Sequence, residues 1–158
     1  MEEIEIGYKI KPFKALDSSG KLFSEENFIG KTTVLYFYPK DMTPGCTQEA
    51  CDFQANIEVF NKLGVQIVGV SPDSAKSHKK FIEKHALDFT LIVDEDAAVC
   101  KHFKVFKDKT LFGIKALGVE RSTFIIDKLG KLVWVEHKVK VAGHSTRILD
   151  FLNNFLEP

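Results

Sequence analysis

The apolar positions of this chain fall into short continuous runs, and stretches with helical spacing separate these runs. Three runs are rich in β-branched and aromatic residues: "TTVLYFYP" at 32–39, "VQIVGVSPD" at 65–73 and "FTLIVD" at 89–94. Runs of this kind are typical of strands buried on both faces of a sheet. Two further segments, 13–24 and 121–139, predict β-hairpins, because each places a glycine-containing turn between two strand-like stretches.

Helical spacing marks four other segments. Residues 46–64 place apolar side chains three and four positions apart and end in Gly64, which predicts one continuous helix. Shorter helices are predicted at 74–87, opened by Ser74, and at 95–103. Residues 145–157 predict a closing amphipathic helix. Its expected inward positions are Ile148, Leu149, Leu152, Phe155 and Leu156.

No element is predicted for 104–120, and the lysine-rich stretch "KHFKVFKDK" at 101–109 is interpreted as a solvated face of helix and loop. The remaining order alternates strands with helices and then ends on a hairpin and a helix. Such an order indicates a mixed sheet with helices on both faces. We therefore expect an α/β fold: a thioredoxin-like three-layer sandwich with a mixed central sheet and an N-terminal β-hairpin. The length suits a single domain over 1–158.

Composition and charge narrow the functional classes. Lys and Arg number 22 and Asp and Glu number 22, so the chain lacks the basic footprint of a nucleic-acid or acidic-lipid binder. The acidic start "MEEIEIGYKI" does not resemble a signal peptide, and the apolar run "VLYFY" is too short to span a bilayer. We expect a cytoplasmic protein with no membrane or nucleic-acid partner. Its three cysteines then argue against a framework of permanent disulfides.

The candidate chemistry lies in "YFYPKDMTPGCTQEACDF" at 36–53, directly after a predicted buried strand. Functional groups of open α/β sheets lie beyond the carboxyl ends of the strands. Pro39 and Pro44 favour extended or turn geometry, which places Gly45 and Cys46 in the first turn of a helix. Free N–H groups and the helix dipole there favour the thiolate of Cys46. Such a position is a poor place to bury a thiol, whereas Cys51 lies deeper in the helix without that support.

The spacing of Cys46 and Cys51 excludes a disulfide in an intact helix. Residues five apart in an ideal helix have Cα atoms about 8.7 Å apart, and a disulfide needs about 4.4–6.8 Å. The two thiols can therefore bond only if the first helical turn unwinds, which suits a redox switch.

A metal site is the alternative use of the thiols. It would combine Cys46, Cys51, Cys100 and His102, but this spacing is not a standard zinc pattern. We expect no metal and no cofactor. Cys100 is expected to be a buried structural thiol, and His144 is expected to be solvated at the start of the last helix, with no histidine grouped near the thiols.

The string "YFYPKDMTPGCTQEAC" is similar to the peroxiredoxin motif P-x-x-x-T-x-x-C, with Pro39, Thr43 and Cys46 at the required spacing. It resembles in particular the bacterioferritin comigratory protein, or peroxiredoxin Q, branch. "RSTFIID" at 121–127 resembles the strand that bears the active-site arginine of that family, here Arg121. The resemblance covers nearly the whole chain.

The resemblance implies a role for each matching residue. Cys46 corresponds to the peroxidatic cysteine, Thr43 to the threonine that hydrogen-bonds the thiolate and the peroxide, and Pro39 to the proline that shields the pocket. Arg121 corresponds to the guanidinium that holds the thiolate and polarises the peroxide, and Gly45 belongs to the substrate-binding turn. By residue type alone, Thr43 would be a turn or cap residue and Arg121 a strand-edge arginine.

Two further residues complete the implied site. Cys51 matches the resolving cysteine found in many members of this branch, and Glu49 resembles a carboxylate near the arginine, although a first-turn acid is ordinarily solvated. The resemblance implies a thiol-dependent peroxidase that reduces hydrogen peroxide and organic hydroperoxides through a Cys46 sulfenic acid. Cys51 would resolve it as an intramolecular disulfide, and thioredoxin or a similar dithiol would recycle that bond.

Absence of the family's "GGLG" and "YF" segments implies a monomer. The alternative functions are a thiol–disulfide oxidoreductase, which the missing C-x-x-C disfavours, and a peroxide-sensing redox relay on the same fold.

Overall fold

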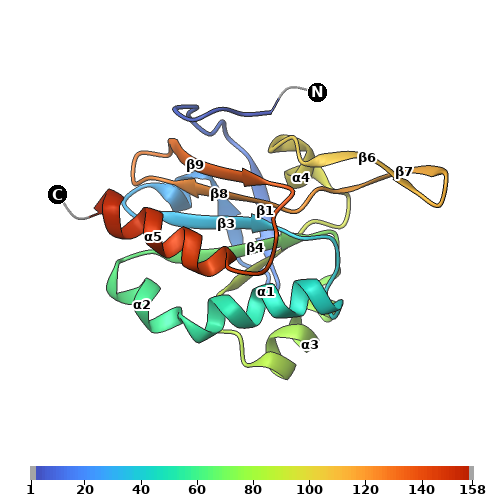
Figure 1. Cartoon of the computed structure of the whole chain (residues 1–158), viewed down its shortest axis with the longest axis horizontal. Helices are drawn as coiled ribbons and strands as arrows, with labels where there is room; N and C mark the ends of the chain where they lie inside the picture. The colour runs from blue at the N-terminus through green and yellow to red at the C-terminus, as the bar shows by residue number, and fades with distance from the viewer. Residues whose placement is uncertain (1–2, 157–158) are drawn as a thin grey trace.

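A mixed sheet of seven strands forms the centre of residues 3–156, the part of the chain that the computed structural model describes (Figure 1). The strand order is β2-β1-β5-β4-β3-β8-β9. Strands β3, β4 and β5 run parallel, and β8 joins the other side of β3 antiparallel. The strands are β1 (Lys14–Asp17), β2 (Leu22–Ser24), β3 (Thr33–Phe37), β4 (Gln66–Ser71), β5 (Thr90–Val93), β8 (Ser122–Ile126) and β9 (Leu132–His137). The three buried strands and both predicted hairpins are confirmed.

Helices cover both faces of the sheet, so the predicted α/β sandwich is confirmed (Figure 1). Residues of α1, α2, α3 and α5 pack on one face, and residues of α4 and the 3-10 helix η1 pack on the other. The helices are α1 (Pro44–Ala55), α2 (Ile57–Lys62), α3 (Ala75–His85), α4 (Ala98–His102), α5 (His144–Leu156) and η1 (Glu25–Phe28). None of the helices between residues 3 and 156 has the length and apolar character that a membrane span requires.

The apolar run of β3 is explained by its position in the middle of the sheet. Val34 and Tyr36 face the α1 side, whereas Leu35 and Phe37 face the α4 side, and all four are buried. Alternate residues of a strand point to opposite faces, so a strand covered on both sides has to be apolar throughout. Gly69 of β4 leaves room for this packing, because a Cβ there would lie 2.7 Å from the Leu91 side chain.

The predicted helix over 46–64 is wrong in one respect, because the chain forms two helices that meet at Asn56. The backbone of Asn56 leaves the helical region (φ −108°, ψ 12°), and its side-chain amide donates to the Asp52 carbonyl at 3.0 Å. Short polar side chains of this type compete with the helical backbone for hydrogen bonds. Gly64 ends the second helix as predicted, with φ at +72°.

Residues 104–120 form a β-hairpin that the sequence analysis missed. Strands β6 (Phe106–Leu111) and β7 (Ile114–Val119) pair antiparallel and project from the body of the protein (Figure 1). The reading of 101–109 as helix and loop is therefore wrong for its second half. The two turn residues, Phe112 and Gly113, both have positive φ, as a tight hairpin turn requires. Phenylalanine is not one of the residues preferred in such turns, so the sequence did not indicate this turn.

Helix α5 is confirmed, but only two of its five expected inward residues are buried, because Leu149 and Leu156 are partly buried and Phe155 is exposed. Ile148 and Leu152 are fully buried, whereas Phe155 is 43% exposed and stacks on Phe151. The last residue of the predicted helix, Glu157, lies outside the described residues, as do the first two residues of the N-terminal segment.

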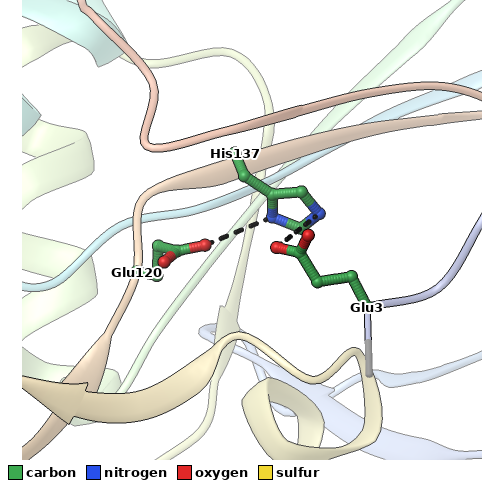
Figure 2. Close-up of side chains that lie close together, drawn as sticks. All are labelled: Glu3, Glu120 and His137. Carbon is green, nitrogen blue, oxygen red and sulfur yellow. Dashed lines mark ion pairs between the residues drawn. The ribbon is translucent and has the colours of Figure 1, made fainter. Parts of the chain in front are cut away.

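A polar cluster ties the N-terminal segment to the base of the β6–β7 hairpin. His137 of β9 lies 3.4 Å from both Glu3 and Glu120 (Figure 2), and Lys107 of β6 lies 2.9 Å and 3.1 Å from the same two carboxylates. Because Glu120 directly precedes Arg121, this cluster holds the backbone next to the candidate site.

Candidate active site

The sheet topology brings Arg121 to the segment that carries the cysteine motif. Ser122, the first residue of β8, pairs with Phe37, the last residue of β3. Arg121 therefore sits at the carboxyl end of β3, where the chain leaves the sheet toward Cys46. A parallel neighbour could not have done this as directly, because the antiparallel pairing sets the start of β8 against the end of β3.

Helix α1 begins at the predicted place. Thr43 is its N-cap residue and Pro44 occupies the first turn, where a proline costs no hydrogen bond. The first intrahelical bond runs from the Thr47 amide to the Thr43 carbonyl at 2.9 Å. The amides of Gly45 and Cys46 precede that bond, so they are free of the helical ladder and available to an anion at the sulfur.

The guanidinium of Arg121 connects the Cys46 thiol to a buried carboxylate. Its Nη2 lies 3.3 Å from Cys46 Sγ, and its Nη1 donates to Glu49 Oε1 at 2.6 Å. A Cβ on Gly45 would lie 3.3 Å from the same Nη2, so the missing side chain allows this close approach. Cys46 itself is only 1% exposed. The expectation that a thiol would not be buried here is therefore wrong, because Cys46 packs in one buried cluster with Tyr36, Tyr38, Ala50 and Phe53.

Glu49, which binds Arg121, also contacts a second buried residue, His144. Glu49 is buried, not solvated, and its Oε2 lies 3.3 Å from Nδ1 of His144. His144 is also buried, at 2% exposure, so its predicted solvated position is wrong. It opens α5, and that helix packs against α1 and sets the ring edge-on to Phe53. This contact could not be predicted from local sequence patterns, because it depends on how α5 crosses α1.

Burial favours the uncharged form of both Glu49 and His144. Burial raises the pKa of Glu49 to about 7, although the Arg121 charge opposes the shift. Burial also lowers the pKa of His144 to about 4, so the imidazole is neutral near pH 7. Glu49 therefore changes charge near neutral pH while it holds Arg121.

Thr43 lies within this turn, but its hydroxyl is used differently from the sequence-based expectation. The hydroxyl donates to the Lys40 carbonyl at 2.8 Å. Its single proton is then committed, and its oxygen lone pairs remain free to accept a hydrogen bond. Pro39 is partly buried between Tyr38 and Lys40 at the start of the same loop.

The three thiols are free and occupy different environments. Cys51 lies in the middle of α1 and is partly exposed, and its Sγ is 3.7 Å from Nδ1 of His85 on α3. The expectation that no histidine lies near the thiols is therefore wrong for this pair.

Cys100 is fully buried in the other core cluster, across the sheet from Cys46. Burial, and then the charge of Asp94, raise the pKa of the Cys100 thiol well above its ordinary value.

A cavity of about 400 Å³ opens beside Arg121. Its walls come from β6, from the link between β7 and β8 and from the end of β9. The lining residues are Lys107, Asp108, Lys109, Glu120, Arg121 and Lys138. Burial, and then the charge of Arg121, lower the pKa of Lys109. The cavity thus presents several cations around the guanidinium. This cavity was not predicted from the sequence, because the β6–β7 hairpin that supplies half of its lining residues was not predicted either.

Comparisons with known proteins show which proteins this chain is similar to. Residues 6–135 match the model of the AhpC/TSA family. The chain is 47% identical over 154 residues to peroxiredoxin Bcp of Bacillus subtilis (strain 168), covering 98% of each sequence. It is 49% identical over 120 residues to peroxiredoxin Bcp of Xanthomonas campestris pv. campestris, covering 76% of this chain and 75% of that protein.

Solved structures give the same result. The bacterioferritin comigratory protein of Xanthomonas campestris, whose structures address its alkyl peroxide reduction activity, has a TM-score of 0.87 and 42% identity, with 92% of each chain covered. A cysteine-to-serine mutant of PrxQ from Xylella fastidiosa has a TM-score of 0.93 and 34% identity, covering 99% of this chain and 100% of that chain.

Proposed function

Because the chain belongs to the AhpC/TSA family, and within it to the Bcp/PrxQ peroxiredoxins, we propose that it is a thiol-dependent peroxidase whose nucleophile is Cys46. The observation that carries this assignment is the contact between Arg121 Nη2 and Cys46 Sγ at 3.3 Å. It places a permanent cation against a thiol at a helix N-terminus, and both features favour the reactive thiolate.

The reaction begins with attack of the Cys46 thiolate on one oxygen of the hydroperoxide. The S–O bond forms, the O–O bond breaks, and the leaving oxygen takes a proton to become water or an alcohol. Cys46 is left as a sulfenic acid. Negative charge grows on the leaving oxygen, so donors that face it lower the barrier. Arg121 and the Cys46 backbone N–H are suited to this task.

Thr43 contributes in another way. Since its proton is engaged by the Lys40 carbonyl, its oxygen is suited to accept a hydrogen bond from the O–H of the peroxide. That contact would orient the substrate for in-line attack by the sulfur. Pro39 and Gly45 complete the turn, and Pro39 would limit solvent access to it. Glu49 would hold the guanidinium in register through its 2.6 Å bond.

The substrates are hydrogen peroxide and organic hydroperoxides. The cavity beside Arg121 leaves room for a substituent larger than a proton, and the Xanthomonas campestris relative is described with alkyl peroxide reduction activity. The organic substituent is bonded to the leaving oxygen, and it would extend from that oxygen toward the mouth of the cavity.

Cys51 is the proposed resolving cysteine. Its thiolate attacks the sulfenic sulfur of Cys46, the S–S bond forms, and the sulfenic oxygen leaves as water after it takes up a proton. Both cysteines lie in the intact helix α1, which holds their Cα atoms about 8.7 Å apart by ideal helix geometry. The first turns of α1 therefore have to unwind during resolution. Thioredoxin or a similar dithiol then reduces the bond.

Peroxide consumption in the presence of thioredoxin, thioredoxin reductase and NADPH tests this assignment. Cys46→Ser should abolish turnover, while Cys100→Ala, which removes a thiol on the other face of the sheet, should retain it. More than a trace of activity in Cys46→Ser would overturn the assignment of the nucleophile. Insulin reduction by the same samples tests the alternative of a thiol–disulfide oxidoreductase, which predicts rapid insulin reduction and slow peroxide loss.

A further inference from the structure

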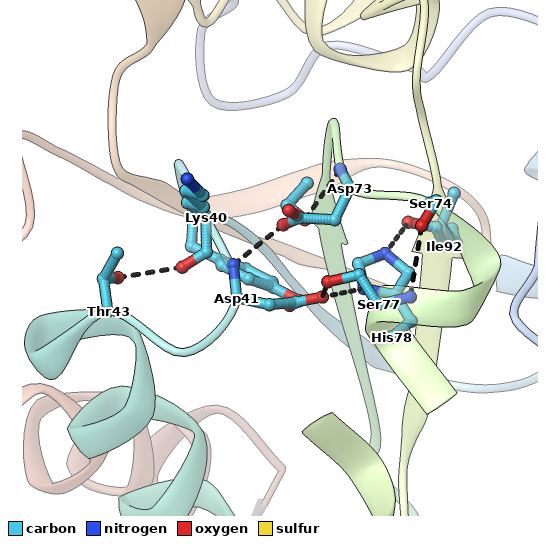
Figure 3. Close-up of polar contacts among 10 residues, drawn as sticks. Lys40, Asp41, Thr43, Asp73, Ser74, Ser77, His78 and Ile92 are labelled. Atoms are coloured by element: carbon cyan, nitrogen blue, oxygen red, sulfur yellow. Dashed lines mark hydrogen bonds and ion pairs between the residues drawn. The ribbon is translucent and has the colours of Figure 1, made fainter. Parts of the chain in front are cut away.

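A second buried polar cluster lies at the other end of the loop that carries Thr43 (Figure 3). Its centre is Asp41, which is 4% exposed, and His78 of α3, which is fully buried. Asp41 Oδ1 accepts a hydrogen bond from the Tyr38 hydroxyl at 2.6 Å, and Oδ2 accepts one from the Ser77 hydroxyl at 2.8 Å. A buried polar cluster destabilises the folded state unless each of its polar groups has a hydrogen-bond partner. Asp41 and His78 take no part in the peroxidase chemistry described above.

The contacts of His78 determine its charge. Its Nε2 lies 2.8 Å from the Ile92 carbonyl oxygen, which can only accept, so Nε2 carries a proton. Its Nδ1 lies 2.7 Å from Asp41 Oδ2, and both Asp41 oxygens already accept from hydroxyl groups. Nδ1 therefore carries a proton as well, and the pair is an imidazolium and a carboxylate. Asp73 lies close enough for a shared metal ion, but a histidine with both nitrogens protonated cannot act as a ligand.

The pKa shifts agree with this assignment. Burial alone would lower the pKa of His78, but the hydrogen bond and charge of Asp41 outweigh it and the pKa is raised. Burial alone would raise the pKa of Asp41, but the bonds from His78 and Tyr38 outweigh it and the pKa is lowered. Each group keeps the other charged.

Asp41 is also held through its backbone. Its amide donates to Asp73 Oδ2 at 2.8 Å, and the same oxygen accepts a bond from the Ser71 hydroxyl at 2.6 Å. Asp41 is therefore fixed by groups from the ends of β3 and β4 and from the first turn of α3, none of which belongs to α1 (Figure 3).

The fixed residue lies at the base of the catalytic turn. Lys40, directly before Asp41, accepts the Thr43 hydroxyl bond. Met42, directly after it, has φ at +67°, a conformation that non-glycine residues adopt only when the surroundings enforce it. Any movement of Asp41 would therefore displace the carbonyl that orients Thr43 and would release the turn into α1.

We propose that Asp41 and His78 are positioning residues of the peroxidase, and that their buried ion pair anchors the Lys40–Thr43 turn against β4, β5 and α3. The inference rests on the proposed function. The pair does not touch Cys46 and does not supply its reactivity. It holds Thr43 where the substrate has to bind, and it provides a fixed base from which α1 can refold after each turnover.

Two rate constants measured on the same variants test this inference. One is the second-order rate of Cys46 oxidation by hydrogen peroxide, which requires Thr43 and Arg121 in place. The other is the rate of Cys46 alkylation by iodoacetamide, which requires only an accessible thiolate; Cys51→Ser and Cys100→Ala in the background restrict labelling to Cys46. His78→Gln and Asp41→Asn should slow oxidation roughly 10- to 100-fold, as misplacement of reacting groups does. Alkylation should change less than about threefold, because the thiolate is preserved.

Matched controls separate positioning from stability. Phe28→Leu, in the core cluster on the opposite face of the sheet, should lower the melting temperature without changing the ratio of the two rates. Tyr38→Phe removes a single bond to Asp41 and keeps the ring, so it should give a folded protein with a smaller effect of the same kind. The ¹⁵N NMR spectrum of wild type should show both His78 ring nitrogens protonated at pH 7.

Each outcome is decisive. Equal oxidation rates in wild type and the Asp41, His78 and Tyr38 variants would overturn the inference alone, as would a neutral His78. A parallel fall in oxidation and alkylation would also overturn it. A wild-type protein that reacts with peroxide no faster than free cysteine would instead overturn the proposed function, and the inference with it.

Discussion

The guanidinium of Arg121 lies 3.3 Å from the sulfur of Cys46, although 75 positions separate the two residues in the sequence. This contact depends on three independent features. Antiparallel pairing of β8 with β3 sets the backbone of Arg121, the missing side chain of Gly45 allows the approach, and the buried carboxylate of Glu49 fixes the other arm of the guanidinium. Each feature can be changed separately.

Arg121→Ala should slow oxidation of Cys46 by a factor of about 10²–10³, because it removes a donor that acts on charge growing in the transition state. Arg121→Lys should retain part of the rate, since an ammonium keeps the charge but cannot reach Glu49 and Cys46 at once. Stopped-flow measurement of the second-order rate with hydrogen peroxide checks this. An unchanged rate in Arg121→Ala would contradict the role assigned to the guanidinium.

Gly45→Ala should slow the peroxide reaction without destabilising the fold. Gly45 lies inside a helix, where alanine is favoured by up to about 1 kcal/mol, but the added Cβ would press on Nη2 of Arg121 at 3.3 Å. We expect a melting temperature equal to or above that of wild type, together with an oxidation rate reduced several-fold. Gly143→Ala cannot serve as a matched glycine-to-alanine control, because Gly143 has φ at +76° and alanine would strain the backbone there. Ala55→Gly, at the far end of α1, provides the reverse change in helix propensity, and it should lower stability and leave the oxidation rate intact.

Glu49→Gln should alter the pH dependence of stability. The folded-state pKa of Glu49 is about 7, above its ordinary value of 4.5, so the folded protein binds the proton more tightly than the unfolded chain. The contribution of Glu49 to the free energy of unfolding therefore falls as the pH rises from 4.5 through 7. His144, with its pKa lowered to about 4, has the opposite effect between pH 4 and 6.5.

Removal of the Glu49 charge should raise the stability at pH 8 relative to pH 5 by on the order of 1–3 kcal/mol, measured by urea denaturation at both pH values. The same variant should oxidise more slowly at pH 8, because a neutral amide holds Arg121 less firmly than a carboxylate. If the stability difference between wild type and Glu49→Gln were the same at pH 5 and pH 8, Glu49 would not titrate in this range.

Cys51→Ser should leave the first reaction with peroxide intact and stall recycling, because the sulfenic acid of Cys46 then has no partner in α1. Mass spectrometry should detect over-oxidised Cys46 after peroxide treatment. In the wild type, oxidation should produce a Cys46–Cys51 bond and a loss of amide protection across 44–55, while protection of the Asp41 amide is retained. A dominant Cys46–Cys100 bond, or equal protection of α1 in both redox forms, would refute this route.

Local chemistry along the chain was sufficient to predict the catalytic turn. The apolar run at 32–39 had to be a doubly buried strand, and Pro44 and Gly45 had to open a helix with Cys46 in its first turn. These features depend on the backbone restrictions of single residues and on side chains a few positions apart. Both can be identified from the sequence alone. For the same reason the Ser74 cap, the Gly64 stop and both predicted hairpins were confirmed.

Only the tertiary structure decided which polar residues are buried and what they contact. Glu49 and His144 were expected to be solvated and Cys46 was expected not to be buried, and no local pattern marked Asp41 or His78 as buried. All five residues are buried in the folded protein. The β6–β7 hairpin, which forms a wall of the cavity, also lacks an apolar alternation because it projects from the core. Burial is set by the packing of α3 and α5 around α1 and the sheet, and the charge of a buried group is set by the partners it meets there. Those partners lie more than 30 positions away in the sequence, beyond the reach of any local pattern.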